Sequence, residues 1–192
     1  MTHLKIHALS VTVIAAALLS ACSAAPSVSP LIEFQTHLQS LCGKTFKGRV
    51  TSTDPQDESW RKSVLTLGPV SCPNAETTVL PLAVGADHSR VWTLTLQDAG
   101  QNLDFRHAHT LKDGSPDPIT NYGGVATASN STAVQAIFPV DEFSKKVFAE
   151  NDLQPSMTNT WSIDIKPRTE MTYRLSREGR NFVAAFDLRQ SK

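Results

Sequence analysis

The chain has 192 residues, and 18 lysine and arginine residues balance 18 aspartate and glutamate residues, so its formal net charge is zero. Charges of both signs are interspersed, whereas a nucleic-acid-binding protein needs a basic face, so the composition argues against a nucleic-acid partner. A chain of this length corresponds to one domain.

The first residues have the pattern of an export signal. Lys5 is followed by an apolar stretch at positions 6–19, which is shorter than the roughly 20 residues that a membrane-spanning helix needs. The stretch closes on Leu19-Ser20-Ala21-Cys22, which resembles the bacterial lipobox. The resemblance implies that residues 1–21 form a lipoprotein signal peptide and that Cys22 is lipidated. The alternative is an ordinary leader that contains a cysteine by chance.

The segment after the lipobox is predicted to be a tether. Residues 22–30 are small, uncharged and interrupted by prolines, which is typical of a flexible link ahead of a folded domain, here a single β-rich domain at residues 31–192. In the two-membrane lipoprotein systems that the motif resembles, aspartate after the cysteine marks retention at the inner membrane, and this chain has Ser23 there. The resemblance thus implies a bacterial cell-envelope protein, lipid-anchored through Cys22 at the periplasmic face of the outer membrane.

Lipidation of Cys22 leaves two of the three cysteines. In an exported, oxidising compartment we expect Cys42 and Cys72 to form a disulfide, with two unpaired buried thiols as the alternative. Such a bond stabilises a fold by roughly 3–4 kcal/mol in the loop-entropy account. Neither cysteine belongs to a CxxC motif, which indicates a structural role.

The periodicity of apolar residues predicts two helices and a series of strands. Apolar residues recur at helical spacing from Leu31 to Leu41, and Gly43 marks the end of this N-terminal helix. A second short helix is predicted near 141–150, with Asp141 as its N-cap. Elsewhere apolar and polar residues alternate in short runs, as in strands. These runs are residues 45–50, 63–67, 76–84, 89–97, 102–111, 122–124, 132–138, 160–166, 171–176 and 181–188.

About eight to ten short strands joined by tight turns predict a mainly β fold, an antiparallel meander. Closure of such a sheet covers its edges and buries its apolar face. We therefore expect a lipocalin-like up-and-down β-barrel with the N-terminal helix across one end, and a two-sheet β-sandwich is the alternative. Pro81 cannot donate to a strand ladder, so its strand should lie at an edge or carry a bulge.

The candidate functional site is the strand at residues 103–111. Alternate residues of a strand share a face, which places His107 and His109 with Phe105 on the apolar side. Two imidazoles on an interior face need hydrogen bonds, a metal ion or water. We expect them to form a ligand-binding site with Phe105 and Trp92. In the alternative interpretation both histidines lie at the solvated end of the strand.

A metal site and a catalytic site are less well supported. The His-x-His pair supplies two ligands, whereas zinc needs three or four. Residues that could complete a site, none of them at a diagnostic spacing, are His37, His88, Asp104, Asp113 and Asp117. The chain has no Gly-x-Ser-x-Gly elbow, glycine-rich phosphate loop or HExxH pattern, so the sequence favours a non-enzymatic protein and indicates no cofactor.

Several short motifs resemble those of an uncharacterised group of proteobacterial exported proteins. The motifs are Arg90-Val91-Trp92-Thr93-Leu94-Thr95, His107-Ala108-His109, Asp113-Gly114-Ser115-Pro116-Asp117 and Tyr122-Gly123-Gly124. That group also begins its domain with a sequence like Leu41-Cys42-Gly43 and ends it with one like Phe186-Asp187-Leu188. The resemblance supports the domain limits and the envelope setting. It implies no function, because the group has no known activity.

Three functions are compatible with these features. In the first, the protein is a binding module that holds a small apolar or amphipathic ligand inside the barrel. In the second, it is a structural or assembly lipoprotein that docks to another envelope protein, with its barrel filled by side chains. In the third, His107 and His109 act with Asp113 and Asp117 in hydrolysis or metal binding. A cavity in the barrel would favour the first.

Overall fold

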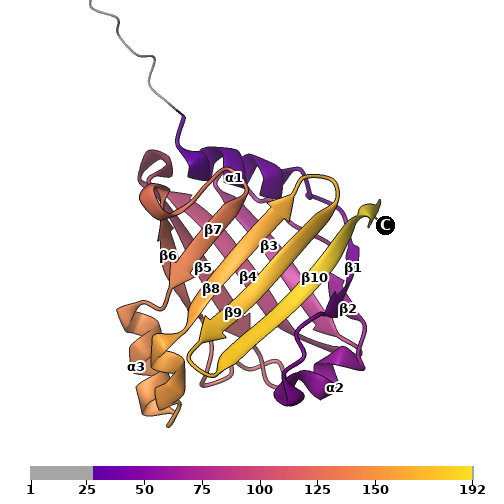
Figure 1. Cartoon of the computed structure of the whole chain (residues 1–192), viewed down its shortest axis with the longest axis vertical. Coiled ribbons are helices and arrows are strands. Elements are labelled where there is room, and N and C mark those ends of the chain that lie inside the picture. Colours follow the sequence, from indigo (N-terminus) through magenta and orange to yellow (C-terminus); the bar gives the residue numbers. More distant parts are fainter. Residues whose placement is uncertain (1–27, 192) are drawn as a thin grey trace, which may run out of the picture.

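The computed structural model describes residues 28–191, in which a ten-stranded antiparallel sheet curls into a nearly closed barrel (Figure 1). The predicted signal peptide, Cys22 and most of the predicted tether lie outside the described residues. The strands are β1 Phe46–Val50, β2 Leu65–Leu67, β3 Thr77–Val84, β4 Asp87–Gln97, β5 Asn102–His109, β6 Tyr122–Thr127, β7 Gln135–Pro139, β8 Thr160–Lys166, β9 Glu170–Arg177 and β10 Arg180–Ser191. The α-helices are α1 Pro30–Gln39, α2 Glu58–Arg61 and α3 Glu142–Glu150.

The strand order confirms the predicted up-and-down barrel. Along the sheet the order is β6-β5-β4-β3-β2-β1-β10-β9-β8-β7, so the first strand pairs with the last and one continuous sheet replaces the two layers of a sandwich. The barrel closes between β6 and β7, where Gly124 and Val140 form a single bridge. A Cβ atom on Gly124 would lie 1.9 Å from the carbonyl oxygen of Pro139. Glycine is therefore required for the close approach that brings these two strands together.

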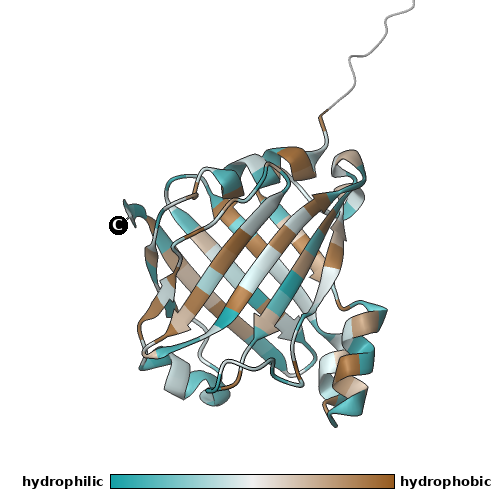
Figure 2. Ribbon diagram, turned by 180° about the vertical axis from the view of Figure 1, so that it is seen from behind, coloured by the Kyte–Doolittle hydropathy of each residue, from teal (hydrophilic) through white to brown (hydrophobic). Residues whose placement is uncertain are grey.

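Apolar residues alternate with more polar ones along the strands (Figure 2). The apolar set shares the inner face of the sheet and forms the core. In β8, for example, Trp161, Ile163 and Ile165 are buried and the residues between them are more exposed. The strand that contains Pro81 is β3, an internal strand between β2 and β4, so the edge position expected for it is wrong. The other expectation holds, because the β3–β4 register shifts between Leu82 and Val84, beside the proline.

One end of the barrel is covered by α1, as predicted (Figure 1). Leu31, Phe34 and Leu38 project from one side of this helix and are fully buried. The disulfide between Cys42 and Cys72 is confirmed, with the two Cα atoms 5.8 Å apart. It joins the segment that follows α1 to the connection between β2 and β3, and so ties the helix to the sheet.

The other helices, α2 and α3, lie at the opposite end of the barrel (Figure 1). Asp141 is the N-cap of α3, as predicted, and accepts a hydrogen bond from the backbone N–H of Ser144 at 2.8 Å. Arg106 of β5 forms ion pairs with Asp104 and Asp141, each with an N–O distance of 2.6 Å, and so fastens α3 to the barrel. Within residues 28–191, no helix has the length and apolar character needed to cross a membrane.

Candidate functional site

A cavity of about 330 Å³ lies inside the barrel at the end opposite α1. Sites for small molecules typically measure about 300–1,000 Å³, so this cavity is at the lower end of that range. Residues of α2 and of two short 3-10 helices, η1 (Pro55–Asp57) and η4 (Gln154–Thr158), form part of its lining. The cavity therefore opens at the end of the barrel that carries the short helices, whereas α1 covers the other end.

The interior of the cavity is aromatic. Trp92 of β4 stacks on Tyr173 of β9 with ring centroids 4.2 Å apart, and Trp161 of β8 stacks on Tyr122 of β6 at 5.9 Å. Trp60 of α2 also lines the cavity, so all three tryptophans of the chain do so. The indole nitrogen of Trp92 is buried and has no hydrogen-bond partner within residues 28–191. The same holds for the indole nitrogen of Trp161. Flat rings with free indole N–H groups are suited to an aromatic or apolar ligand that carries an acceptor.

His107 lies deep in this aromatic interior, with 8% of its surface exposed. Its Nδ1 atom is hydrogen-bonded to the hydroxyl of Tyr122 at 2.9 Å, and its Nε2 atom has no partner among the described residues. Burial lowers the pKa of His107 to about 3, and the nearby Arg90 and His109 act in the same direction. Burial also raises the pKa of Tyr122 to about 12. The pair is therefore neutral at physiological pH, and one ring nitrogen remains for a further hydrogen bond.

His109 lines the same cavity closer to its mouth. Its Nδ1 atom lies 2.9 Å from a carboxylate oxygen of Asp117, and its backbone N–H donates to the hydroxyl of Thr120 at 2.7 Å. The side chains of His109 and Asp117 are 27% and 17% exposed. Solvent thus reaches His109, in contrast to His107, two residues earlier on the same face of β5.

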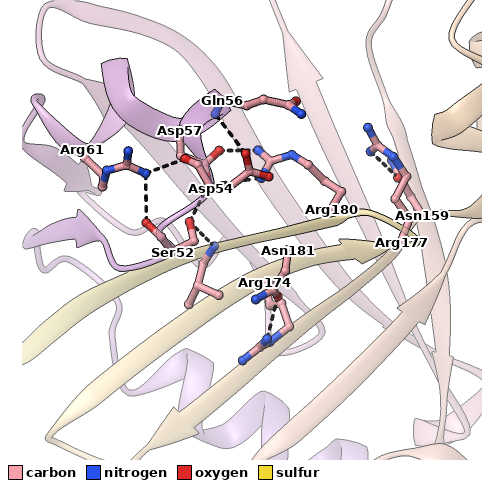
Figure 3. A network of polar contacts seen from close by, with 11 residues as sticks. Ser52, Asp54, Gln56, Asp57, Arg61, Asn159, Arg174, Arg177, Arg180 and Asn181 are labelled. Atoms are coloured by element: carbon pink, nitrogen blue, oxygen red, sulfur yellow. Dashed lines mark hydrogen bonds and ion pairs between the residues drawn. The ribbon is translucent and has the colours of Figure 1, made fainter.

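The mouth of the cavity is held by a polar network that the sequence analysis missed (Figure 3). Asp57, which is 1% exposed, accepts hydrogen bonds from both terminal nitrogens of Arg180 and, at 2.6 Å, from the hydroxyl of Ser52. Arg180 also donates to Asp54 at 3.2 Å. Burial raises the pKa of Asp57, but the hydrogen bonds from Arg180 and Ser52 outweigh it, so that pKa lies below its usual value. This network fixes η1 and α2 against β10 and thereby places Trp60 at the mouth.

The predicted ligand-binding residues are divided between the cavity and the core. Trp92, His107 and His109 line the cavity. Phe105 is fully buried on the same face of β5 but lies deeper in the barrel, outside the cavity lining. Period-2 alternation identifies the face of a strand and carries no information on depth along the barrel axis, which is why Phe105 could not be distinguished from the two histidines.

Of the residues proposed for metal binding or hydrolysis, His109 and Asp117 form a pair, and the others lie apart from it. Asp113 accepts hydrogen bonds from Ser115 within its own turn, and Asp104 is paired with Arg106 on the outer face of the barrel. His37 lies in the last turn of α1, at the end of the barrel away from the cavity. Across residues 28–191, no group of three His, Cys, Asp or Glu side chains is arranged to hold a metal ion.

The basic residues of the cavity lining, Arg90, Arg177 and Arg180, were also missed. The alternation that buries Met171 and Tyr173 also assigns Arg177 to the inner face of β9, so a signal was present in the sequence. The alternation of Phe182, Ala184 and Phe186 likewise assigns Arg180 to the inner face of β10. Trp60 offered no such signal, because it reaches the cavity only through barrel closure and the contacts of Asp57.

The chain was compared with protein-family models, with curated proteins and with solved structures. None of the three comparisons finds a match.

Proposed function

We propose that this protein is a lipid-anchored binding protein of the bacterial envelope, whose barrel holds one small amphipathic ligand. The proposed anchor is Cys22, and the proposed ligand site is the cavity that contains Trp92, His107 and Tyr173. The protein acts in this proposal by holding its ligand reversibly, without converting it.

The observation that carries the proposal is the combination of an aromatic cavity with unpartnered buried nitrogens. Nε2 of His107 and the indole nitrogen of Trp92 have no hydrogen-bond partner within residues 28–191, and both residues line the cavity. A buried polar group without a partner costs about 1–3 kcal/mol, and such groups in native proteins are nearly always satisfied by protein, water or ligand. A ligand with one or two polar atoms on an apolar body would satisfy both nitrogens and cover the rings.

The same geometry favours binding over the two other functions considered from the sequence. A barrel that serves only as a structural support is expected to be filled by side chains, whereas this one retains about 330 Å³ of space. For hydrolysis His107 would have to exchange protons with its surroundings, but burial keeps its pKa at about 3. A neutral imidazole hydrogen-bonded to Tyr122 is better suited to orienting a ligand.

The test is a titration with N-phenyl-1-naphthylamine, a neutral aromatic amine whose fluorescence rises in apolar surroundings. Because all three tryptophans line the cavity, we expect saturable quenching of tryptophan emission at one probe per protein. The variant Ser156→Phe places a ring in the cavity lining and should weaken binding at least tenfold.

The matched control is Ser162→Phe on β8, whose side chain lines a shallow groove on the outer surface of the barrel. This variant should bind as the wild type does. Equal affinities for the probe in both variants, or no quenching of the tryptophans in the wild type, would contradict the proposed function.

A further inference from the structure

The β9–β10 hairpin places two arginines opposite each other at the mouth of the cavity. Arg177 and Arg180 are register partners, and both line the cavity. Like charges directly opposite each other on adjacent strands destabilise a sheet. The charge of Arg180 is matched by Asp54 and Asp57. Within residues 28–191, Arg177 has no carboxylate within ion-pair distance.

The polar partner of Arg177 is a neutral amide. One of its terminal nitrogens donates to Oδ1 of Asn159 at 2.9 Å, and Asn159 is 4% exposed (Figure 3). Burial and the neighbouring Arg180 lower the pKa of Arg177, yet a guanidinium keeps its charge at any physiological pH. It carries five N–H donors in a planar fork, so most of the donors of Arg177 remain for another acceptor.

The remaining charges around the cavity do not neutralise Arg177. Arg90 lies 5.0 Å from the ring centroid of Trp60 and pairs with Asp87, which is 46% exposed and lies outside the cavity lining. The one carboxylate in the lining, Asp57, is bound by Arg180. Within residues 28–191, Arg177 is thus the one guanidinium of the cavity lining that no carboxylate neutralises.

We infer that the ligand is an anion, with one carboxylate, sulfonate or phosphate group on an aromatic or apolar body, and that Arg177 binds the acidic group. The inference rests on the proposed function and specifies the ligand class. A planar guanidinium matches two oxygens of such a group, and both hydrogen bonds are charge-assisted. The aromatic cavity receives the body, and Arg177 holds the head at the mouth.

The test uses two probes that share one aromatic body. N-phenyl-1-naphthylamine is neutral, and 8-anilinonaphthalene-1-sulfonate is the same molecule with a sulfonate added. Each is titrated against the full mature chain in moderate salt, with tryptophan quenching and a stoichiometry of one as the criteria for binding in the cavity. We expect the wild type to bind the sulfonate at least tenfold more tightly than the neutral probe, as one charge-assisted hydrogen-bond pair implies.

Four variants locate the source of this preference. Arg177→Gln should remove most of the tenfold preference, measured as the ratio of the two affinities, whereas Arg177→Lys should retain part of the preference. Asn159→Asp supplies Arg177 with a carboxylate of its own, so it should also abolish the preference while the arginine remains. The control is Arg174→Gln, because Arg174 also donates to an amide oxygen, that of Asn181 at 2.7 Å, but lies on the exposed face of β9. It should change neither affinity.

The outcomes separate the inference from the function on which it rests. Binding of the neutral probe with no preference for the sulfonate would overturn the anionic ligand and leave the proposed function intact. A preference that survives in both Arg177→Gln and Asn159→Asp would overturn the role of Arg177. Failure of both probes to quench the tryptophans would overturn the inference and the proposed function together.

Discussion

His107 is the residue whose surroundings have the clearest consequence for stability. Its pKa in the folded protein is about 3, against an ordinary value of about 6.5 for the unfolded chain. Above pH 6.5 both states carry a neutral ring, so this residue does not affect the equilibrium. As the pH falls from 6.5 towards 3, the imidazole of His107 is protonated in the unfolded chain but stays neutral in the folded protein, so the free energy of unfolding decreases.

We therefore predict that the free energy of unfolding of the wild type decreases between about pH 6.5 and about pH 5, in a range above the ordinary pKa of carboxylates. The variant His107→Gln retains a polar partner for the hydroxyl of Tyr122 and does not titrate, so its decrease should be clearly smaller. Urea unfolding at several pH values measures the difference. Identical pH profiles for the two proteins would contradict the neutral, buried state of His107.

Arg180 is the second residue whose surroundings predict a large effect. It binds Asp57, which is 1% exposed, and removing one partner of a buried ion pair leaves an uncompensated charge. Arg180→Ala should lower the free energy of unfolding by about 3 kcal/mol, the lower end of the usual range, because the network lies near the surface. Arg189→Ala, on the exposed part of the same strand, is the control and should have little effect. Equal stabilities of the two variants would show that the network at the mouth contributes nothing.

At the scale of elements, the disulfide determines how firmly α1 covers its end of the barrel. Cys42 follows the helix and Cys72 lies between β2 and β3, with a sequence separation of 30. Closing a loop of this length stabilises a fold by roughly 3–4 kcal/mol. We predict that the double variant Cys42→Ser, Cys72→Ser loses about this amount in a denaturant titration, and that reduction of the wild type has the same effect. A midpoint that does not move on reduction would contradict this account.

Most of the helices and strands, and part of the candidate site, could be predicted from the sequence. The helix from Leu31 to Leu41, the N-cap at Asp141 and the strands were predictable, because each element buries one face and so carries its own period. The site was partly predictable, since alternation along β5 places His107 and His109 inside the barrel. The position of Trp60 and the carboxylate partners of Arg180 were not predictable, because they come from a one-turn helix and from ion pairs between positions more than 120 residues apart.

At the scale of the whole molecule, α1, the first helix after the proposed anchor in the sequence, and the proposed ligand site lie at opposite ends. The chain enters the barrel through α1, and the cavity opens at the end that carries α2 (Figure 1). A tether from residue 23 to residue 29 spans at most about 25 Å. A protein anchored at Cys22 would therefore hold its α1 end near the membrane and open its cavity towards the aqueous compartment.

This arrangement predicts two results. Cys22→Ala should abolish incorporation of labelled fatty acid and release the protein from the membrane fraction, or leave it unprocessed. Iodide in solution should quench the tryptophans of the anchored protein as efficiently as those of the released variant, because the mouth faces away from the lipid. Continued membrane attachment of Cys22→Ala, or protection of the tryptophans from iodide in vesicles, would contradict the proposed anchor or the orientation.

The central claim is that the barrel interior binds a ligand, and the indole N–H signals of the three tryptophans test it most directly. In a proton–nitrogen correlation spectrum each indole gives one signal, and assignment needs only single Trp→Phe variants. On addition of one equivalent of N-phenyl-1-naphthylamine, the account predicts large shifts of the Trp92 and Trp161 signals, while the outer-face amides of β8 and β9 remain unchanged. Unchanged indole signals, or shifts confined to the outer face of the barrel, would contradict it.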